Sequence, residues 1–388
     1  MESTPLRSED VREKNEKLVL RYIQHSQGIS QSEIVQKTGL KAPTVLRIFS
    51  ILEADGLIMV QKNPPERDFG DKKGRRPVYY TVNPRARYVI GLEFWSLTAF
   101  ILVVDFARNP VYSLEICLRE DVDALTIYSQ LEKLIAQAIT ESGIDPARIL
   151  GLGVGAPGQV DVKTGEIISY RKTKGFTNFN LGQRLHERFG CRVKVANNAG
   201  VIALHAYRQG VAKESHALFT FFIRRGVGGA FIHEGNLFSV LGKTAFEVGH
   251  TIVNMDGKSC YCGSRGCLEA YISEAAILES LEENDLHFDT IEEVEQRLAV
   301  EDRAVTDIVR QCARYLSVSG QSVLRLLSPD GFLIITRFRT LSRIFADELE
   351  QMIRCDACED CVQVYHNAYA PLEAGLGACD LIFDEYLH

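Results

Sequence analysis

The chain contains 388 residues, of which 46% are hydrophobic and 24% charged, with a formal net charge of −7. This composition excludes a wholly disordered or collagen-like protein and supplies enough apolar residues for two or three domains. No run of about 18 apolar residues occurs, and the charged N-terminus lacks the apolar segment of a secretory signal. We therefore expect a cytoplasmic protein with no membrane partner, whose 10 cysteines are thiols or metal ligands rather than disulfides.

The charges are distributed unevenly along the chain. Residues 1–88 contain 16 Lys and Arg against 11 Asp and Glu, whereas residues 89–388 contain 28 against 40. A basic N-terminal segment ahead of an acidic body is typical of a DNA-binding module joined to a second unit. A chance fluctuation in surface charge would give the same counts, so the motifs have to decide between the two interpretations.

Residues 12–56 predict three short helices. Ser30 and Glu33 have the spacing of a capping box at the start of the second helix, and Gly39 begins the turn that follows it. Pro43 suits the first turn of the third helix. A helix, a short glycine turn and another helix form the pattern of a helix-turn-helix.

Two strand-like segments, 57–61 and 78–82, flank a loop rich in Pro, Gly and basic residues. This arrangement predicts a winged helix-turn-helix DNA-binding domain over residues 1–84, with the third helix in the major groove and the wing on phosphates or in the minor groove. The alternative is a three-helix protein-interaction module, but the polar and basic start of the third helix favours DNA. The expected DNA contacts are Lys41, Thr44, Arg47, Lys72, Lys73, Arg75 and Arg76.

From residue 88 onward, near-continuous apolar runs such as 88–94 and 99–106 alternate with helical segments. Buried strands alternating with helices are typical of an α/β domain. We expect two successive α/β halves with a ligand crevice between them, and we place the last long helix near residues 341–352.

A metal site is predicted by His250 and the C-x-C-x4-C motif of Cys260, Cys262 and Cys267. Three thiols and one imidazole are the donors of a tetrahedral zinc site, and four protein ligands make such a site structural rather than catalytic. Free buried cysteines are the alternative, but the glycines around the motif indicate the tight turns that wrap an ion.

The remaining cysteines give weaker signals. One cluster lacks flanking glycines or histidine, so its role as metal ligands, redox thiols or incidental thiols stays open, and we favour incidental thiols. Four others sit in apolar runs and are expected in the core. The first group is Cys355, Cys358 and Cys361, and the second is Cys117, Cys191, Cys312 and Cys379.

Several motifs together resemble the ROK family of repressors, open reading frames and sugar kinases. The matching segments are the glycine-rich strand and turn at 151–161, the sugar motif at 196–200, the second phosphate loop at 225–235, and the Glu-x-Gly-His and zinc-knuckle signatures at 245–250 and 260–269. The resemblance extends over roughly residues 15–385. It implies an actin-like, hexokinase-like fold of two α/β lobes, with a structural zinc and a sugar bound in the interlobe cleft.

This resemblance also suggests where the lobes begin and end. Residues 85–388 would form the sugar-binding and dimerisation domain. One lobe would contain approximately residues 85–198 plus the C-terminal helix, and the other residues 199–370.

The chain departs from the family's kinases at three places. Trp95 and Leu97 replace a Gly and the Thr of the phosphate-binding turn, and residues 333–338 replace a glycine pair used near the adenine. Asn198 aligns with the catalytic Asp, and an amide has no useful basicity. We therefore expect no kinase activity. The glycines left in the second loop, expected to serve the hairpin only, are Gly226, Gly228 and Gly229.

The sugar side of the resemblance is better preserved. Carboxylates and amides that bracket neighbouring hydroxyls are what a pyranose site needs. Two of these residues, Glu247 and Glu269, could instead only brace the zinc turn, and His250 could serve both metal and sugar. The expected sugar contacts are Asn197, Asn198, Glu247, His250 and Glu269.

These observations predict a sugar-responsive transcriptional regulator, most simply a repressor, that binds a pseudo-palindromic operator as a homodimer, with a tetramer as a further option. One alternative is a sugar kinase with an appended DNA-binding domain. Another is a repressor whose effector is a protein, such as a phosphotransferase-system component. The sequence does not discriminate among glucose, xylose and N-acetylglucosamine, nor between repression and activation.

Overall fold

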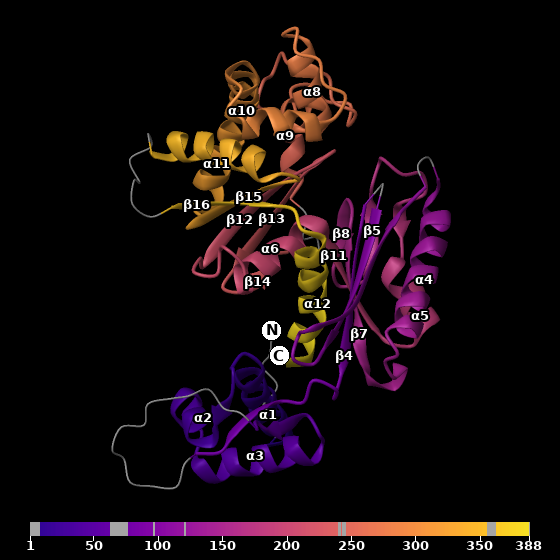
Figure 1. Ribbon diagram of the computed structural model, residues 1–388, viewed down its shortest axis with the longest axis vertical. Helices are drawn as coiled ribbons and strands as arrows, with labels where there is room; N and C mark the ends of the chain where they lie inside the picture. Colours follow the sequence, from indigo (N-terminus) through magenta and orange to yellow (C-terminus); the bar gives the residue numbers. More distant parts are fainter. Residues whose placement is uncertain are drawn as a thin grey trace.

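The computed structural model describes residues 8–62, 77–95, 98–119, 122–239, 242, 246–354 and 362–387. Figure 1 shows a small N-terminal unit beneath a larger body built of two sheets with helices. We call the small unit, residues 8–62 and 77–84, the head. None of the helices in the described ranges is long and apolar enough to span a membrane.

The head confirms the predicted winged helix-turn-helix. Ser30 and Glu33 form the expected capping box, and Gly39 ends the second helix in the left-handed region at φ 70°. The short sheet has the order β1-β3-β2. The elements are α1 (Ser8–Gln24), β1 (Ile29–Ser30), α2 (Gln31–Thr38), α3 (Ala42–Ala54), β2 (Ile58–Val60) and β3 (Tyr79–Val82).

Lobe one is built on a five-stranded sheet of order β11-β7-β4-β5-β6. Strands β4, β7 and β11 run parallel, while β5 and β6 form an antiparallel extension. The strands are β4 (Tyr88–Phe94), β5 (Thr98–Asp105), β6 (Pro110–Cys117), β7 (Ile149–Ala156) and β11 (Arg192–Asn197). The outer helices are α4 (Ala124–Glu141), η1 (Pro146–Arg148) and α5 (Leu181–Phe189), and a small sheet contains β8 (Gln159–Asp161), β9 (Glu166–Ser169) and β10 (Thr177–Phe179).

Lobe two is built on a second five-stranded sheet of order β14-β13-β12-β15-β16. Its strands are β12 (Ala217–Ile223), β13 (Val227–His233), β14 (Asn236–Leu237), β15 (Gly331–Thr336) and β16 (Gln363–Ala368). Its helices are η2 (Val248–His250), α7 (Glu269–Ile272), α8 (Glu274–Glu282), α9 (Ile291–Ala299), α10 (Arg303–Leu327) and α11 (Arg339–Arg354). The two α/β halves are therefore confirmed, while the residue boundaries 85–198 and 199–370 stay a prediction.

Two helices, α6 (Asn198–Arg208) and α12 (Pro371–Leu387), lie between the two sheets (Figure 1). Helix α12 packs on β4 and β7, and α6 packs on β12 and β13. Glycines in the strands permit this close approach, because a Cβ at Gly153 would lie 1.8 Å from the carbonyl oxygen of Ala378. The helices thus form a shared middle layer that holds the lobes together.

The prediction of a long helix near residues 341–352 is confirmed, but the prediction that it is the last one is wrong. That segment is α11, and both β16 and α12 follow it. Helix α12 is contacted by α6 and by strands of lobe one, so it presents no continuous polar face. A helix without such a face lacks the periodic pattern by which a surface helix is identified in a sequence.

The four cysteines expected in the core do not share one environment. Cys312 and Cys379 are buried as predicted, and Cys191 is partly buried. Cys117 is exposed, so its assignment to the core is wrong. It lies on the edge strand β6, where alternate side chains point away from the helix-covered face. The cluster of Cys355, Cys358 and Cys361 lies outside the described residues.

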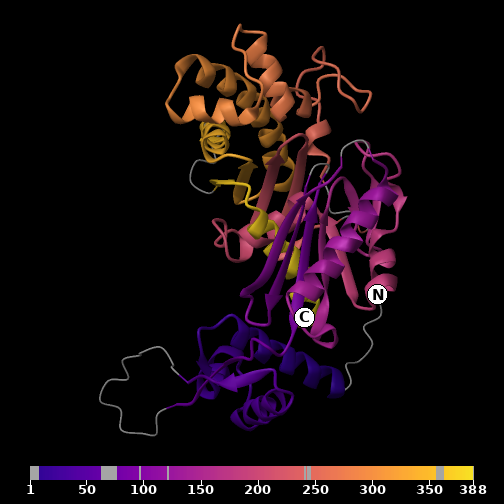
Figure 2. The same cartoon turned by 45° about the vertical axis from the view of Figure 1, so that its right-hand side comes forward.

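The head packs against the end of lobe one near the C-terminus, as Figures 1 and 2 show. The Gln24 side chain of α1 donates a hydrogen bond to the carbonyl oxygen of Phe106 at 2.9 Å. The Phe106 ring contacts Phe383 and Tyr386 of α12. Apolar residues of the head, of β5 and of α12 thus belong to one continuous buried cluster.

Candidate functional site: the cleft between the lobes

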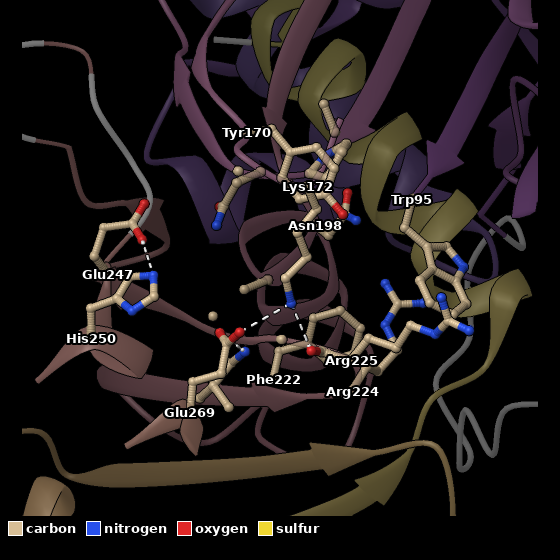
Figure 3. A pocket seen from close by; sticks show the side chains of 18 of the residues that line it. Trp95, Tyr170, Lys172, Asn198, Phe222, Arg224, Arg225, Glu247, His250 and Glu269 are labelled. Carbon is tan, nitrogen blue, oxygen red and sulfur yellow. Dashed lines mark hydrogen bonds and ion pairs between the residues drawn. The ribbon is translucent and has the colours of Figure 1, made fainter. Parts of the chain in front are cut away.

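A cavity of about 140 Å³ lies between the two lobes. The chain segments that form it are the ends of β4 and β7, the loop after β9, the start of α6, the β12–β13 bend and the segment around η2. Figure 3 shows side chains from both lobes pointing toward one another across it. All five expected sugar contacts line this cavity, namely Asn197, Asn198, Glu247, His250 and Glu269.

The two asparagines at the start of α6 are both buried but have different partners. Asn197 is the N-cap, and its side-chain oxygen accepts from the Gly200 amide at 3.0 Å. Asn198 donates through Nδ2 to the carbonyl oxygen of Phe94 at 3.0 Å. The buried Oδ1 of Asn198 has no hydrogen-bond partner among the described residues. Such an orphaned acceptor is costly unless a water or ligand donates to it.

Glu269 is held by partners on both of its oxygens. Oε1 lies 3.0 Å from Nζ of Lys172, and Oε2 accepts from the Val227 amide at 2.9 Å. The carboxylate is buried, and Lys172 reaches it from the opposite lobe. Lys172 also donates to the carbonyl oxygen of Arg225 at 2.7 Å.

Glu247 and His250 lie on the opposite side of the cavity from Trp95 (Figure 3). A Glu247 carboxylate oxygen lies 3.9 Å from Nε2 of His250. Desolvation raises the pKa of Glu247, because the ionised carboxylate loses water around it. The hydroxyl of Tyr261 lies 3.2 Å from the same imidazole nitrogen. The other nitrogen of His250, Nδ1, faces the cysteine motif.

The four predicted metal ligands come together. The ligand atoms of His250, Cys260, Cys262 and Cys267 all lie within 4.8 Å of one another. Nδ1 of His250 is 3.6 Å from the Cys260 sulfur, and the sulfurs of Cys262 and Cys267 are also 3.6 Å apart. Tetrahedral ligands at ordinary zinc distances would be separated by about 3.6–3.8 Å. The donor set and spacing therefore fit a four-coordinate metal ion.

One thiol of this cluster is already predisposed to ionise. A hydrogen bond from the Ser264 backbone lowers the pKa of Cys262 to about 7. Burial has the opposite effect on the other two thiols and raises the pKa of Cys260 and Cys267, so ionisation of the three thiols would be coupled to metal binding.

A buried ion pair joins the lobes beside the cavity. Arg224, at the end of β12, donates through Nη2 to Glu93 of β4 at 2.9 Å. Glu93 is fully buried and the Arg224 side chain is 6% exposed. Tyr369 donates to the second Glu93 oxygen at 2.8 Å. The guanidinium also lies 4.3–4.6 Å from the ring centroids of Phe222, Trp95 and Tyr369.

This ion pair occupies the region where the sequence departs from the kinase pattern. Trp95 covers the guanidinium of Arg224, while Leu97 lies outside the described residues. In the segment 333–338, Arg337 pairs with Glu274 and Glu292. The glycines expected to serve the hairpin do lie in the β12–β13 hairpin. Gly226 is at its bend, and Gly228 and Gly229 are in β13.

The head exposes the predicted recognition surface. Lys41, Thr44 and Arg47 are exposed, and the opposite face of α3 buries Val45 and Phe49. The expected wing contacts Lys72, Lys73, Arg75 and Arg76 lie outside the described residues.

The sequence reasoning missed Lys172, Arg224 and Tyr369. The position of Arg224 directly after the apolar run of β12 was a weak signal for a buried ion pair, because charged side chains are rarely buried without a partner. No comparable signal marked the other two residues, whose roles depend on contacts between distant segments.

Comparison with known proteins gives a consistent result. A model described as the ROK family matches residues 111–385, and a model described as winged helix-turn-helix DNA-binding matches residues 12–59. The chain is 24% identical over 353 residues to a xylose repressor from Caldicellulosiruptor bescii, and the alignment covers 87% of each chain.

Two solved structures show the same fold. The crystal structure of a ROK family transcriptional regulator, a homologue of the Escherichia coli Mlc protein, has a TM-score of 0.82 at 20% identity. The match covers 97% of this chain and 98% of that one. A ROK family glucokinase from Streptomyces griseus, in complex with glucose and AMPPNP, has a TM-score of 0.64 at 23% identity. This match covers 76% of the present chain and 98% of the glucokinase chain.

The buried ion pair leads to a first prediction. Replacing Arg224 with Met should lower the free energy of unfolding by about 3–5 kcal/mol, because Glu93 then stays buried without its counter-ion. The double variant Glu93→Gln/Arg224→Met should lose clearly less than the sum of its single variants. Chemical denaturation of all three variants measures this coupling.

The control for this cycle is Arg12→Met, which removes a solvent-exposed ion pair with Glu16. It should cost no more than about 1 kcal/mol. Additive effects of the two substitutions at Glu93 and Arg224 would show that the pair does not act as a unit.

Proposed function

The chain belongs to the ROK family, and on that premise we propose that it is a sugar-responsive, DNA-binding transcriptional regulator, most simply a repressor, without kinase activity. The observation that carries this proposal is Asn198. It stands at the catalytic position of the family's kinases and is bound to the backbone of Phe94. An amide cannot remove a proton from a sugar hydroxyl, but it can hydrogen bond to one.

The same cleft gives further support for binding without phosphoryl transfer. Arg224 and Trp95 fill the space beside Glu93, where the kinases have a glycine-containing phosphate turn. Residues 333–338 replace the family's glycine pair near the adenine, and Arg337 in that segment pairs with Glu274 and Glu292. Trp95 and Arg224 thus occupy the place where the backbone amides of a kinase turn would receive phosphates.

The head supplies the proposed output. Lys41, Thr44 and Arg47 would contact DNA from α3 in the major groove, and the basic wing would contact phosphates. A homodimer would present two heads to a pseudo-palindromic operator, because its two-fold symmetry matches that of the site. A tetramer would offer two such pairs.

The cleft supplies the proposed input. Asn197, Asn198, Glu247, His250 and Glu269 would bind the hydroxyls of a sugar, with the orphaned Oδ1 of Asn198 as one acceptor. The Glu269 carboxylate contacts Lys172 and a backbone amide outside the knuckle, so its role is not limited to bracing the knuckle. The name of the xylose repressor relative makes D-xylose the first sugar to test.

We assign zinc to the four-ligand cluster. His250, Cys260, Cys262 and Cys267 would hold the ion, which would supply a tetrahedral cross-link within the knuckle. His250 would keep its position because Tyr261 contacts its second nitrogen. The knuckle in turn leads directly into α7, where Glu269 is the first residue.

The DNA contact is tested with Arg47→Ala. Loss of one guanidinium from α3 should weaken operator binding about 10-fold or more, because a good base contact is worth about 1–3 kcal/mol. Lys133→Ala, which removes an exposed charge from α4, is the control and should bind like the wild type. Fluorescence anisotropy at fixed salt measures both, and equal affinity of Arg47→Ala would remove α3 from the interface.

The sugar response is tested with Glu247→Ala. This variant should keep operator affinity and lose sugar affinity by roughly 10-fold or more, because hydrogen bonds to a carboxylate contribute about 1.5–3 kcal/mol. Glu115→Ala, on the exposed edge strand β6, should respond normally. Operator release is followed during titration with D-xylose, D-glucose and N-acetyl-D-glucosamine. A normal response of Glu247→Ala would place the effector elsewhere.

The metal is tested by elemental analysis of the purified protein. We expect about one zinc ion per chain, and Cys260→Ser should lose it together with thermal stability. Cys117→Ser, which changes an exposed thiol away from the cluster, should retain the metal. Zinc retained at the wild-type level by Cys260→Ser would contradict the assignment.

A further inference from the structure

Two ion pairs among the described residues join the lobes beside the cavity, and they differ in how easily they can break. The Glu93–Arg224 pair is buried, and aromatic rings surround the guanidinium. The Lys172–Glu269 pair lies in the cavity itself, where the lysine side chain is 29% exposed and the carboxylate 8%. Figure 3 shows Lys172 reaching across the cavity to Glu269. Of the two pairs, only this second one has both partners among the residues that line the cavity.

The two oxygens of Glu269 have partners of different mobility. Oε2 accepts from the backbone amide of Val227, which is fixed within the β12–β13 hairpin. Oε1 is held by the ammonium group at the end of the long, flexible Lys172 side chain. A ligand hydroxyl that approaches this carboxylate can therefore replace the lysine but not the amide.

The lysine would not be left without a partner after such an exchange. Its Nζ already donates to the carbonyl oxygen of Arg225 at 2.7 Å. It also lies 5.0 Å from the centroid of the Tyr261 ring, within the range of a cation–π contact. Because neither contact involves Glu269, the cost of releasing Glu269 is mainly that of the ion pair itself.

We propose that Lys172 is a built-in competitor for the effector, which must displace the lysine from Glu269 in order to bind. This inference rests on the proposed function, in which sugar hydroxyls bind Glu269. Displacement breaks an ion pair between the lobes at the same moment as the sugar binds. Effector binding and a change in the connection between the lobes thus become one event, with the buried Glu93–Arg224 pair left intact.

The competition has a measurable consequence for affinity. A partly exposed ion pair contributes up to about 1 kcal/mol, so its loss in the unliganded protein should tighten sugar binding about fivefold. A lysine that only donates to the sugar would have the opposite effect when removed. The sign of the change therefore separates a competitor from an ordinary contact.

The experiment compares Lys172→Met with Lys172→Arg and with the control Lys174→Met, which removes an exposed charge two residues along the same loop. Calorimetric titration uses D-xylose, D-glucose and N-acetyl-D-glucosamine. We expect Lys172→Met to bind the wild type's sugar about fivefold more tightly, while the other two variants bind like the wild type. Equal or weaker binding by Lys172→Met would overturn the proposal.

Hydrogen exchange of the unliganded proteins provides a second measurement. Peptides covering residues 170–176 and the β12–β13 bend should exchange faster in Lys172→Met than in Lys174→Met, because the interlobe ion pair is gone. Unchanged exchange would overturn the proposed role of the pair. A wild type that binds none of the three sugars would contradict the proposed function, whereas a wild type that binds while Lys172→Met gains nothing contradicts only the competition.

Discussion

The buried pair between Glu93 and Arg224 is the constraint on which the arrangement of the body depends. One partner lies on the central strand of lobe one and the other at the end of a strand of lobe two, so neither lobe can satisfy its own charge alone. Removing either partner would leave a buried charge without its counter-ion, which is far costlier than breaking a surface pair. The cleft is therefore formed by two lobes that share one electrostatic centre.

Helix α12 extends this connection to the head. Tyr369, which donates to Glu93, lies just before the first turn of α12, and Phe383 and Tyr386 near its end contact Phe106 beside the head. The helix also packs on the sheet of lobe one and on α6, whose first residue is Asn198. The cleft and the head are thus attached to opposite ends of the same rigid element.

The sequence predicted those features that depend on neighbours along the chain. Turn and cap signals at Ser30 and Gly39 located the helices of the head, and the spacing of the knuckle cysteines located the metal ligands. The ion pairs across the cleft could not be predicted in this way, because Arg224 lies 131 residues from Glu93, and Glu269 lies 97 residues from Lys172. A C-terminal helix was expected only from the family resemblance, because the neighbours of α12 bury more than one of its faces and leave no periodic pattern.

The placement of α12 has a consequence for synthesis of the protein on the ribosome. The head is made before α12, yet Ile382, Phe383 and Leu387 belong to the apolar cluster that also contains residues of α1. Until α12 has been made, this surface of the nascent head lacks the α12 residues that cover it. A chain that lacks the last turns of α12 would therefore carry a helix-turn-helix that is poorly anchored to its sensor and more open to proteolysis.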